Sequence, residues 1–263
     1  MRERIITGVI GVPVLLICSY FGGWLWAVLI GLLALLAAYE LGALFIKRSI
    51  AASFLLDGAA VLLLALAFGL ICSIRWPFLL ALLAVMVAYA LNAQARDVPL
   101  GHSLGRAFTA LYVGVGLGAM LALRLGFMDF RWIWLAFLSV WVTDSAAHLV
   151  GSRHGRTSLA PRISPHKTWE GALAGLLCAT VIGAIYMGLV LSMNFFSSLP
   201  LALLFSLAAQ VGDLIESAFK RWAGVKDSGR IFPGHGGVLD RFDSLFLCAP
   251  LILLLLWQSQ VRG

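Results

Sequence analysis

Apolar residues run through the chain in long continuous stretches that are separated by polar connections. The stretches lack the period-two alternation of a membrane β-barrel, and a transmembrane helix needs about 20 mostly apolar residues. The pattern therefore predicts an all-α polytopic integral membrane protein with about nine transmembrane helices. The expected spans are residues 5–21, 24–46, 52–72, 77–94, 104–124, 131–151, 169–192, 199–219 and 241–258.

Composition supports this fold class. The mean hydropathy is +0.99, and only 12% of the 263 residues are charged. A soluble domain of this composition would have too little polar surface to cover itself. The first apolar stretch follows MRER without a clean small-residue cleavage site, so we expect a retained helix rather than a removed signal sequence.

The distribution of Lys and Arg predicts the orientation. With the N-terminus inside, only four of the 19 basic residues fall in outer connections, which leaves 15 on the inner side. Such a bias favours a cytoplasmic N-terminus, and it explains part of the net charge of +7. The four outer basic residues are Arg75, Arg124, Arg131 and Arg262.

Most polar sequence lies in two inner connections, about 152–168 and 220–240. No internal repeat or inserted soluble domain is visible, so residues 1–263 are expected to form a single membrane domain. Within it, residues 1–125 form generic transmembrane helices and residues 126–263 contain the motifs suited to catalysis. The polar site is therefore expected at the cytoplasmic side.

One polar stripe crosses an otherwise apolar helix in QVGDLIESAFKR, residues 210–221. Gln210, Asp213, Glu216 or Ser217, and Lys220 recur every three to four residues and share one helix face. A carboxylate inside a bilayer costs several kcal/mol unless it is paired, hydrated or bound to a metal. The stripe is therefore either an internal ion pair, with a lysine one turn on, or part of a functional site.

A glycine-rich turn follows this helix. Pro233 and three glycines surround His235, and Gly236 and Gly237 allow backbone amides to approach an anion closely. A plain turn would explain GHGG alone, but the surrounding cations are suited to phosphate oxygens. These cations are Lys220, Arg221, Lys226, Arg230 and Arg241.

Carboxylates gather at the same depth. Asp240 and Asp243 are three residues apart at a helix start, and Asp213 and Asp144 lie near the inner ends of other spans. Such oxygen ligands hold Mg²⁺, which predicts phosphoryl or nucleotidyl transfer. The four cysteines lie in apolar runs without metal-ligand spacing and indicate neither zinc nor a disulfide.

The connection at residues 143–171 repeats this chemistry in another arrangement. Ser164 and Thr168 are candidate helix caps before the seventh span. Lys167 and Glu170 are either phosphate-binding residues or an interfacial anchor and a helix-start acid. The histidines of the connection, His148, His154 and His166, are expected to have no chemical role.

One group of residues in the C-terminal half resembles a family signature; it consists of Ser217 to Arg221, Lys226, Asp227 and the segment PGHGGVLDRFD. The signature is that of the phosphatidate cytidylyltransferase family, also called CDP-diglyceride synthases. QVGDLIES and SPHKTWEG are similar to further blocks of that family. The resemblance covers the C-terminal half. The chain departs from the family pattern at TDSAAHL, Arg156 and His166, so Asp144, His148 and His166 receive no role from the motif.

The resemblance implies that CTP and phosphatidic acid give CDP-diacylglycerol and pyrophosphate. It further implies a homodimer that lies among the membrane lipids of the cytoplasmic (inner) membrane. It also implies that the reaction uses Mg²⁺, with K⁺ as a second ion beside it in part of the family. By motif position, Asp213 and Asp240 bind the metal, and Ser217 and Lys220 join the two aspartates in catalysis. Asp144 and Asp243 are further metal candidates because of their depth, not because of the motif. The expected phosphate-binding residues are Lys167, Arg221, Lys226, His235, Gly236, Gly237 and Arg241.

Two other functions are compatible with such a chain. A CTP-dependent polyprenol or dolichol kinase would have comparable carboxylate and basic blocks. An anion transporter would place polar groups near the midplane, often in two related halves, which this sequence lacks. Nucleic acid is not an expected partner, because no soluble basic domain is present.

Overall fold

The computed structural model describes residues 2–45, 50–69, 76–95, 99–126, 129–229, 231 and 236–261. They form two compact units, each considered by itself. Unit 1 comprises Met1–Asp129 and Ala223–Phe242, and unit 2 comprises Phe130–Trp222 and Asp243–Gly263. The chain thus leaves unit 2 after α8, contributes 20 residues to unit 1, and returns. We call Ala223–Phe242 the returning segment; the expected single membrane domain stays a prediction.

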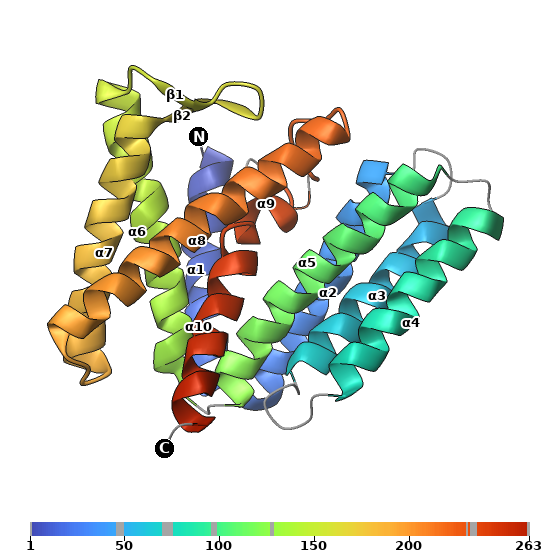
Figure 1. Ribbon diagram of the computed structural model, residues 1–263, viewed down its shortest axis with the longest axis horizontal. Helices are drawn as coiled ribbons and strands as arrows, with labels where there is room; N and C mark the ends of the chain where they lie inside the picture. The colour runs from blue at the N-terminus through green and yellow to red at the C-terminus, as the bar shows by residue number, and fades with distance from the viewer. Residues whose placement is uncertain are drawn as a thin grey trace. The chain divides into compact units, whose positions relative to one another are not determined.

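Unit 1 is built around α5, which packs against α2, α3 and α4 (Figure 1). The close packing of α3 on α5 depends on two glycines, because a Cβ on Gly114 or Gly118 would lie 2.6 Å from Leu64 or from the Ala65 carbonyl oxygen. The helices of this unit are α1 Arg2–Phe21, α2 Gly23–Phe45, α3 Ile50–Gly69, α4 Trp76–Ala95, α5 Leu100–Leu125 and α9 Leu239–Phe242.

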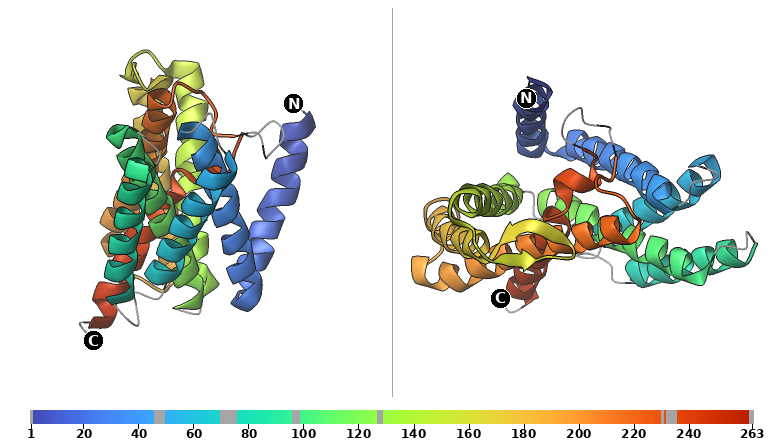
Figure 2. Two further views of the ribbon diagram at one scale, coloured as in Figure 1. Left: turned by 90° about the vertical axis from the view of Figure 1, so that its right-hand side faces the viewer. Right: turned by 90° about the horizontal axis from the view of Figure 1, so that it is seen from above.

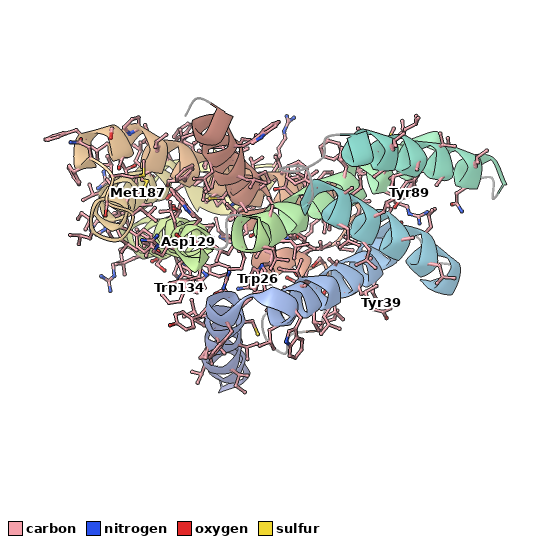
Figure 3. The ribbon with its side chains drawn as sticks, turned by 90° about the horizontal axis from the view of Figure 1, so that it is seen from below. Trp26, Tyr39, Tyr89, Asp129, Trp134 and Met187 are labelled. Carbon is pink, nitrogen blue, oxygen red and sulfur yellow. The ribbon has the colours of Figure 1, made fainter. Side chains whose placement is uncertain are left out.

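Polar side chains join the helices of unit 1 at defined points. The fully buried Trp26 of α2 (Figure 3) donates its indole N–H to the Met120 carbonyl of α5. Arg124, in the last turn of α5, donates to the Ser19 and Tyr20 carbonyls at the end of α1. These carbonyls lack helical partners, so a cation satisfies them well.

A buried ion pair connects α3 and α5. Arg106 Nη2 lies 2.8 Å from Asp57 Oδ1, and both side chains are 0% exposed. Tyr89 of α4 (Figure 3) donates its hydroxyl to the same carboxylate, and the Arg106 guanidinium lies 5.3 Å from the centre of the Tyr89 ring. Three helices therefore meet at one carboxylate.

Unit 2 packs α6, α7, α8 and α10 together and has a two-stranded β-hairpin between α6 and α7 (Figure 2). Small residues let α6 and α7 approach closely, since a Cβ on Gly171 or Gly175 would lie 2.6 Å from the carbonyl of Ala147 or Thr143. The elements are α6 Phe130–His154, β1 Ser158–Ala160, β2 Ser164–Thr168, α7 Trp169–Val190, α8 Phe195–Trp222 and α10 Leu245–Val261.

The all-α, polytopic prediction is confirmed. Over the described ranges, five helices are long and apolar enough to cross a membrane, and four more contain shorter apolar stretches. Within the described residues, all nine expected segments coincide with helices. Two details differ: the hairpin was expected as a loop, and the expected helix start at residue 241 is divided, because α9 ends at Phe242 and α10 begins at Leu245.

We expect the Asp57–Arg106 pair to be necessary for stability. Asp57→Asn leaves the Arg106 charge buried without its counter-ion, which should lower the free energy of unfolding by about 3–5 kcal/mol. Replacing both residues, as in Asp57→Leu with Arg106→Met, should cost less than the sum of the two single changes. Thermal unfolding in detergent measures the effect, and additive losses would contradict the prediction.

Candidate functional site

A cavity of about 600 Å³ lies within unit 2, between α6, the hairpin and the facing sides of α7 and α8. Asp144 and His148 line it from α6, His166 and Lys167 from β2, and Asp213 from α8. The structure therefore brings together the carboxylates of Asp144 and Asp213 and the lysine of the SPHKTWEG block. His148 and His166, which were expected to have no chemical role, also line this space.

The hairpin and the start of α7 hold Lys167 in place. Strand β2 pairs antiparallel with β1, with Ser158 opposite Thr168 and Ala160 opposite Ser164. Thr168 caps α7 by accepting a hydrogen bond from the Gly171 amide at 3.2 Å, so of the two expected caps it is Thr168 that serves this helix. Lys167 immediately precedes this cap, so the strand and the helix start both restrict its backbone.

Lys167 forms an ion pair with Asp213. Both side chains are about a quarter exposed, and Ser217 donates a weak hydrogen bond of 3.4 Å to the same aspartate. Asp213 is therefore held from two sides, by a lysine of the hairpin and by a serine one turn further along α8. The pair places a cation and a carboxylate at the wall of the cavity.

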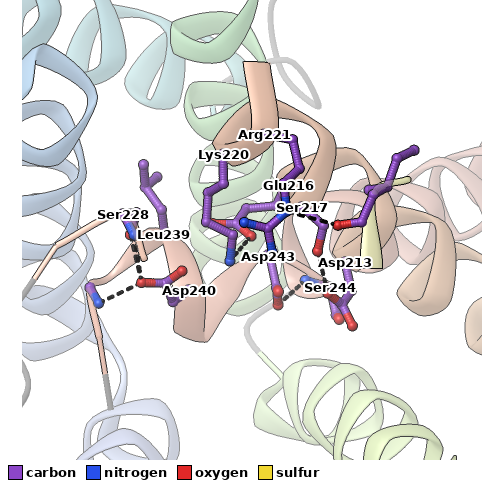
Figure 4. Close-up of polar contacts among 12 residues, drawn as sticks. Asp213, Glu216, Ser217, Lys220, Arg221, Ser228, Leu239, Asp240, Asp243 and Ser244 are labelled. Atoms are coloured by element: carbon purple, nitrogen blue, oxygen red, sulfur yellow. Dashed lines mark hydrogen bonds and ion pairs between the residues drawn. The ribbon is translucent and has the colours of Figure 1, made fainter. Parts of the chain in front are cut away.

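The next turn of α8 contains a second ion pair, between Glu216 and Lys220 (Figure 4). Of the two alternatives left open for the stripe, the internal ion pair is found at Glu216, whereas Asp213 pairs with Lys167. Arg221 donates from Nε to the Ile163 carbonyl in the hairpin at 3.0 Å. Arg221 thus ties the end of α8 to the turn between β1 and β2.

Asp243 follows α9 and belongs to unit 2, where it accepts a hydrogen bond from the Ser244 amide at 2.6 Å (Figure 4). Burial raises the pKa of Asp243 well above its ordinary value, and the charges of Asp213, Glu216 and Asp144 raise it further. Three carboxylates of unit 2 are therefore close enough to Asp243 to repel its charge. A cation among them would relieve that repulsion.

This oxygen-only donor set fits Mg²⁺ better than zinc. Among the residues that the structure describes, no group of three or more His, Cys, Asp and Glu side chains is placed to hold a metal ion by itself. Mg²⁺ does not require such a cage, since it commonly binds one or two carboxylates and completes its shell with water and substrate phosphates.

Unit 1 contains the other predicted aspartate. Asp240 Oδ2 accepts hydrogen bonds from the Gly237 amide at 2.8 Å and from the Ser228 amide and hydroxyl at 3.0 and 2.9 Å (Figure 4). Gly236 has φ +79°, and a Cβ there would lie 2.5 Å from the Asp240 carboxylate. Gly236 and Gly237 therefore allow the backbone to lie directly against the Asp240 carboxylate. A plain turn would not require this close contact.

The remaining predicted residues are placed as follows. Lys226 and Arg241 of the returning segment are exposed, which leaves their charges accessible to a ligand. His235, Arg230 and Cys72 lie outside the described residues. Asp213 belongs to unit 2 and Asp240 to unit 1, so their joint metal site stays a prediction.

Glu40 was not among the predicted site residues, and it lies in the half that was expected to form generic transmembrane helices. Its carboxylate accepts hydrogen bonds from Val238 and Leu239, directly before Asp240. A signal was present, because Glu40 is the only charged residue within α2. An isolated ionisable residue in an apolar span is a candidate functional residue, because its burial in lipid is energetically costly.

Comparisons with known proteins agree over nearly the full length. A model of the cytidylyltransferase family matches residues 2–258. Relatives named phosphatidate cytidylyltransferase cover 98% of this chain and 100% of their own. They are 36% identical over 264 residues in Staphylococcus aureus (strain COL), 34% over 265 in Staphylococcus haemolyticus (strain JCSC1435) and 35% over 264 in Staphylococcus epidermidis (strain ATCC 12228 / FDA PCI 1200).

Removing the Asp243 charge should stabilise the metal-free protein. Because folding raises the pKa of Asp243, the wild-type protein loses stability as the pH rises from the ordinary Asp pKa toward the raised value. In EDTA at neutral pH, Asp243→Asn should therefore raise the midpoint of thermal unfolding by several degrees. Asp129→Asn, outside this carboxylate group, is the control; a lower midpoint for Asp243→Asn would contradict the prediction.

Proposed function

The chain belongs to the cytidylyltransferase family, and from that premise we propose that it is a phosphatidate cytidylyltransferase. It would transfer the cytidylyl group of CTP to phosphatidic acid, giving CDP-diacylglycerol and pyrophosphate. The observation that carries the proposal is the extent of the match, because the relatives of that name align over their whole length and over 98% of this chain. The kinase alternative has no comparable support.

The lipid phosphate is the proposed nucleophile. One of its oxygens forms a bond to the α-phosphorus of CTP while the bond from that phosphorus to the pyrophosphate leaving group breaks. No protein nucleophile is needed, because the phosphate is already ionised at neutral pH. Catalysis then consists of orienting the two phosphates in line and of stabilising the charge that develops.

The cations of the site would do most of this work. Lys167 lies at the wall of the unit 2 cavity, where its ammonium group can bind a phosphate oxygen in exchange for Asp213. Lys220 and Arg221 at the end of α8, and the exposed Lys226 and Arg241, would neutralise the triphosphate. Bound Mg²⁺, held by Asp213 and Asp240, would supply further charge neutralisation; Asp144 and Asp243 are the other candidate ligands, and K⁺ a second ion.

In the proposed topology, the chain crosses the membrane nine times, and its N-terminus and its active site lie on the cytoplasmic side of an inner membrane. The excess of Lys and Arg in alternate connections supports this orientation. It is the orientation in which CTP, a charged nucleotide, reaches the basic residues without crossing the bilayer. A homodimer remains part of the proposal.

The fate of two labels distinguishes nucleotidyl transfer from phosphorylation. With purified protein, phosphatidic acid and Mg²⁺, cytosine-labelled CTP should give labelled organic-extractable lipid, whereas γ-³²P from CTP should appear in pyrophosphate. A lipid kinase would produce the opposite distribution. Omission of phosphatidic acid is the control, and cytosine label that never enters lipid would refute the proposed function.

The two signature aspartates should be necessary for turnover. Asp213→Asn and Asp240→Asn each remove an anionic ligand, so we expect kcat to fall by about 100-fold or more at saturating Mg²⁺. EDTA should abolish wild-type activity, and added Mg²⁺ should restore it. Asp129→Asn serves as the matched carboxylate control, and an Asp213→Asn or Asp240→Asn protein with full activity would remove that residue from the site.

A further inference from the structure

Glu40 is a buried carboxylate in an apolar helix. Its side chain is 1% exposed, and α2 contains no other charged residue. Burying an ionised carboxylate costs several kcal/mol unless hydrogen bonds or an opposite charge replace the lost water. The partners that meet this cost indicate why the chain places a glutamate here.

Both carboxylate oxygens of Glu40 bind the returning segment, nearly 200 residues away in sequence. Oε1 accepts from the Val238 amide at 2.8 Å, and Oε2 accepts from the Leu239 amide at 2.9 Å. The Ser228 hydroxyl approaches Oε2 at 3.2 Å. A single side chain of α2 therefore binds two amides at the end of the returning segment and also lies next to Ser228, earlier in the same segment.

Two glycines make room for this carboxylate. A Cβ on Gly237 would overlap the Glu40 carboxylate, and a Cβ on Gly229 would lie 2.6 Å from its Oε1. Any residue other than glycine at either position would force the glutamate out. The two glycines are thus evidence for the same contact that does not depend on the hydrogen bonds, because the Glu40 carboxylate occupies the space that their side chains would need.

The same backbone holds Asp240. Ser228 donates to Asp240 Oδ2 as well as approaching Glu40, and Gly237, whose amide binds Asp240, directly precedes Val238. Glu40 and Asp240 therefore bind the same short stretch of backbone. Glu40 holds the Val238 and Leu239 amides from α2, and the adjacent Gly237 amide holds Asp240. Moving Glu40 would release the Val238 and Leu239 amides, which directly precede Asp240. It would also remove the carboxylate next to Ser228, the serine that donates to Asp240.

We propose that Glu40 is a positioning residue for the reaction. It fixes the returning segment so that Asp240 and the neighbouring Arg241 have the orientation that cytidylyl transfer requires, without touching either substrate. The inference rests on the proposed function. Its physical reason is that displacement of a catalytic group by about 1 Å costs about 100-fold in rate, so a distant residue that sets the backbone affects turnover.

Glu40→Gln tests the proposal with a minimal change. The glutamine keeps the size, but its amide NH₂ must face either the Val238 or the Leu239 N–H, donor against donor. We expect kcat to fall by about 10–100-fold, with a smaller loss in Glu40→Asp, which keeps the charge. In hydrogen exchange, peptides covering residues 236–243 should exchange faster in Glu40→Gln than in wild type.

Asp57→Asn is the matched control, because Asp57 is also a buried carboxylate of unit 1 but binds Arg106 and Tyr89. If Glu40 were merely structural, both variants would lower the unfolding midpoint and leave the kcat of the folded fraction and the exchange of residues 236–243 unchanged. That result for Glu40→Gln would overturn the inference. Size-exclusion chromatography defines the folded fraction for each protein.

A double-mutant cycle tests the contact with Gly237 directly. Gly237→Ala should be harmful in the wild-type background, where its methyl group overlaps Glu40, and less harmful in Glu40→Ala, where the space is vacated. Additive effects on kcat and on exchange would contradict the contact. If wild-type protein transfers no cytidylyl group, the proposed function fails, and the exchange measurements still decide whether Glu40 fixes the segment.

Discussion

A charged side chain is stable in an apolar helical protein only when another group replaces its water. Each described unit meets this constraint in its own way. In unit 1, Asp57 is paired with Arg106, and Glu40 is bound by two backbone amides. In unit 2, Lys167 and Lys220 each pair with one carboxylate of α8. The positions of these partners determine which segments come together, so the polar minority of residues organises the fold.

Glycines make this organisation possible, for two distinct reasons. Gly114, Gly118 and Gly175 allow helix backbones to approach one another, which is a matter of packing between apolar surfaces. Gly229, Gly236 and Gly237 instead leave space for carboxylates, and only Gly236 among these three needs a positive φ. At Gly229, Gly236 and Gly237, the absence of a side chain is therefore explained by the carboxylates of Glu40 and Asp240 within the protein.

The sequence was sufficient to predict the helices, whereas the roles of the site residues stay predictions. The apolar runs located the helices because hydrocarbon solvation acts on each run separately. The stripe on α8 gave an internal ion pair as one of its two alternatives, because the geometry of such a pair is local. The Lys167–Asp213 pair, the hairpin and the Glu40 contacts could not be predicted in this way. They join residues 46 to about 200 positions apart or depend on weak short strands, and a pattern in one segment does not specify its distant partner.

The separation between Glu40 and the returning segment has a consequence for biosynthesis. Glu40 leaves the ribosome 198 residues before Val238, and at roughly 5–20 residues per second the interval is about 10–40 s. Helix α2 must therefore enter the bilayer while the groups that will bind its carboxylate do not yet exist. Until then Glu40 is either protonated or hydrated, and the last fifth of the chain completes the folding of the first.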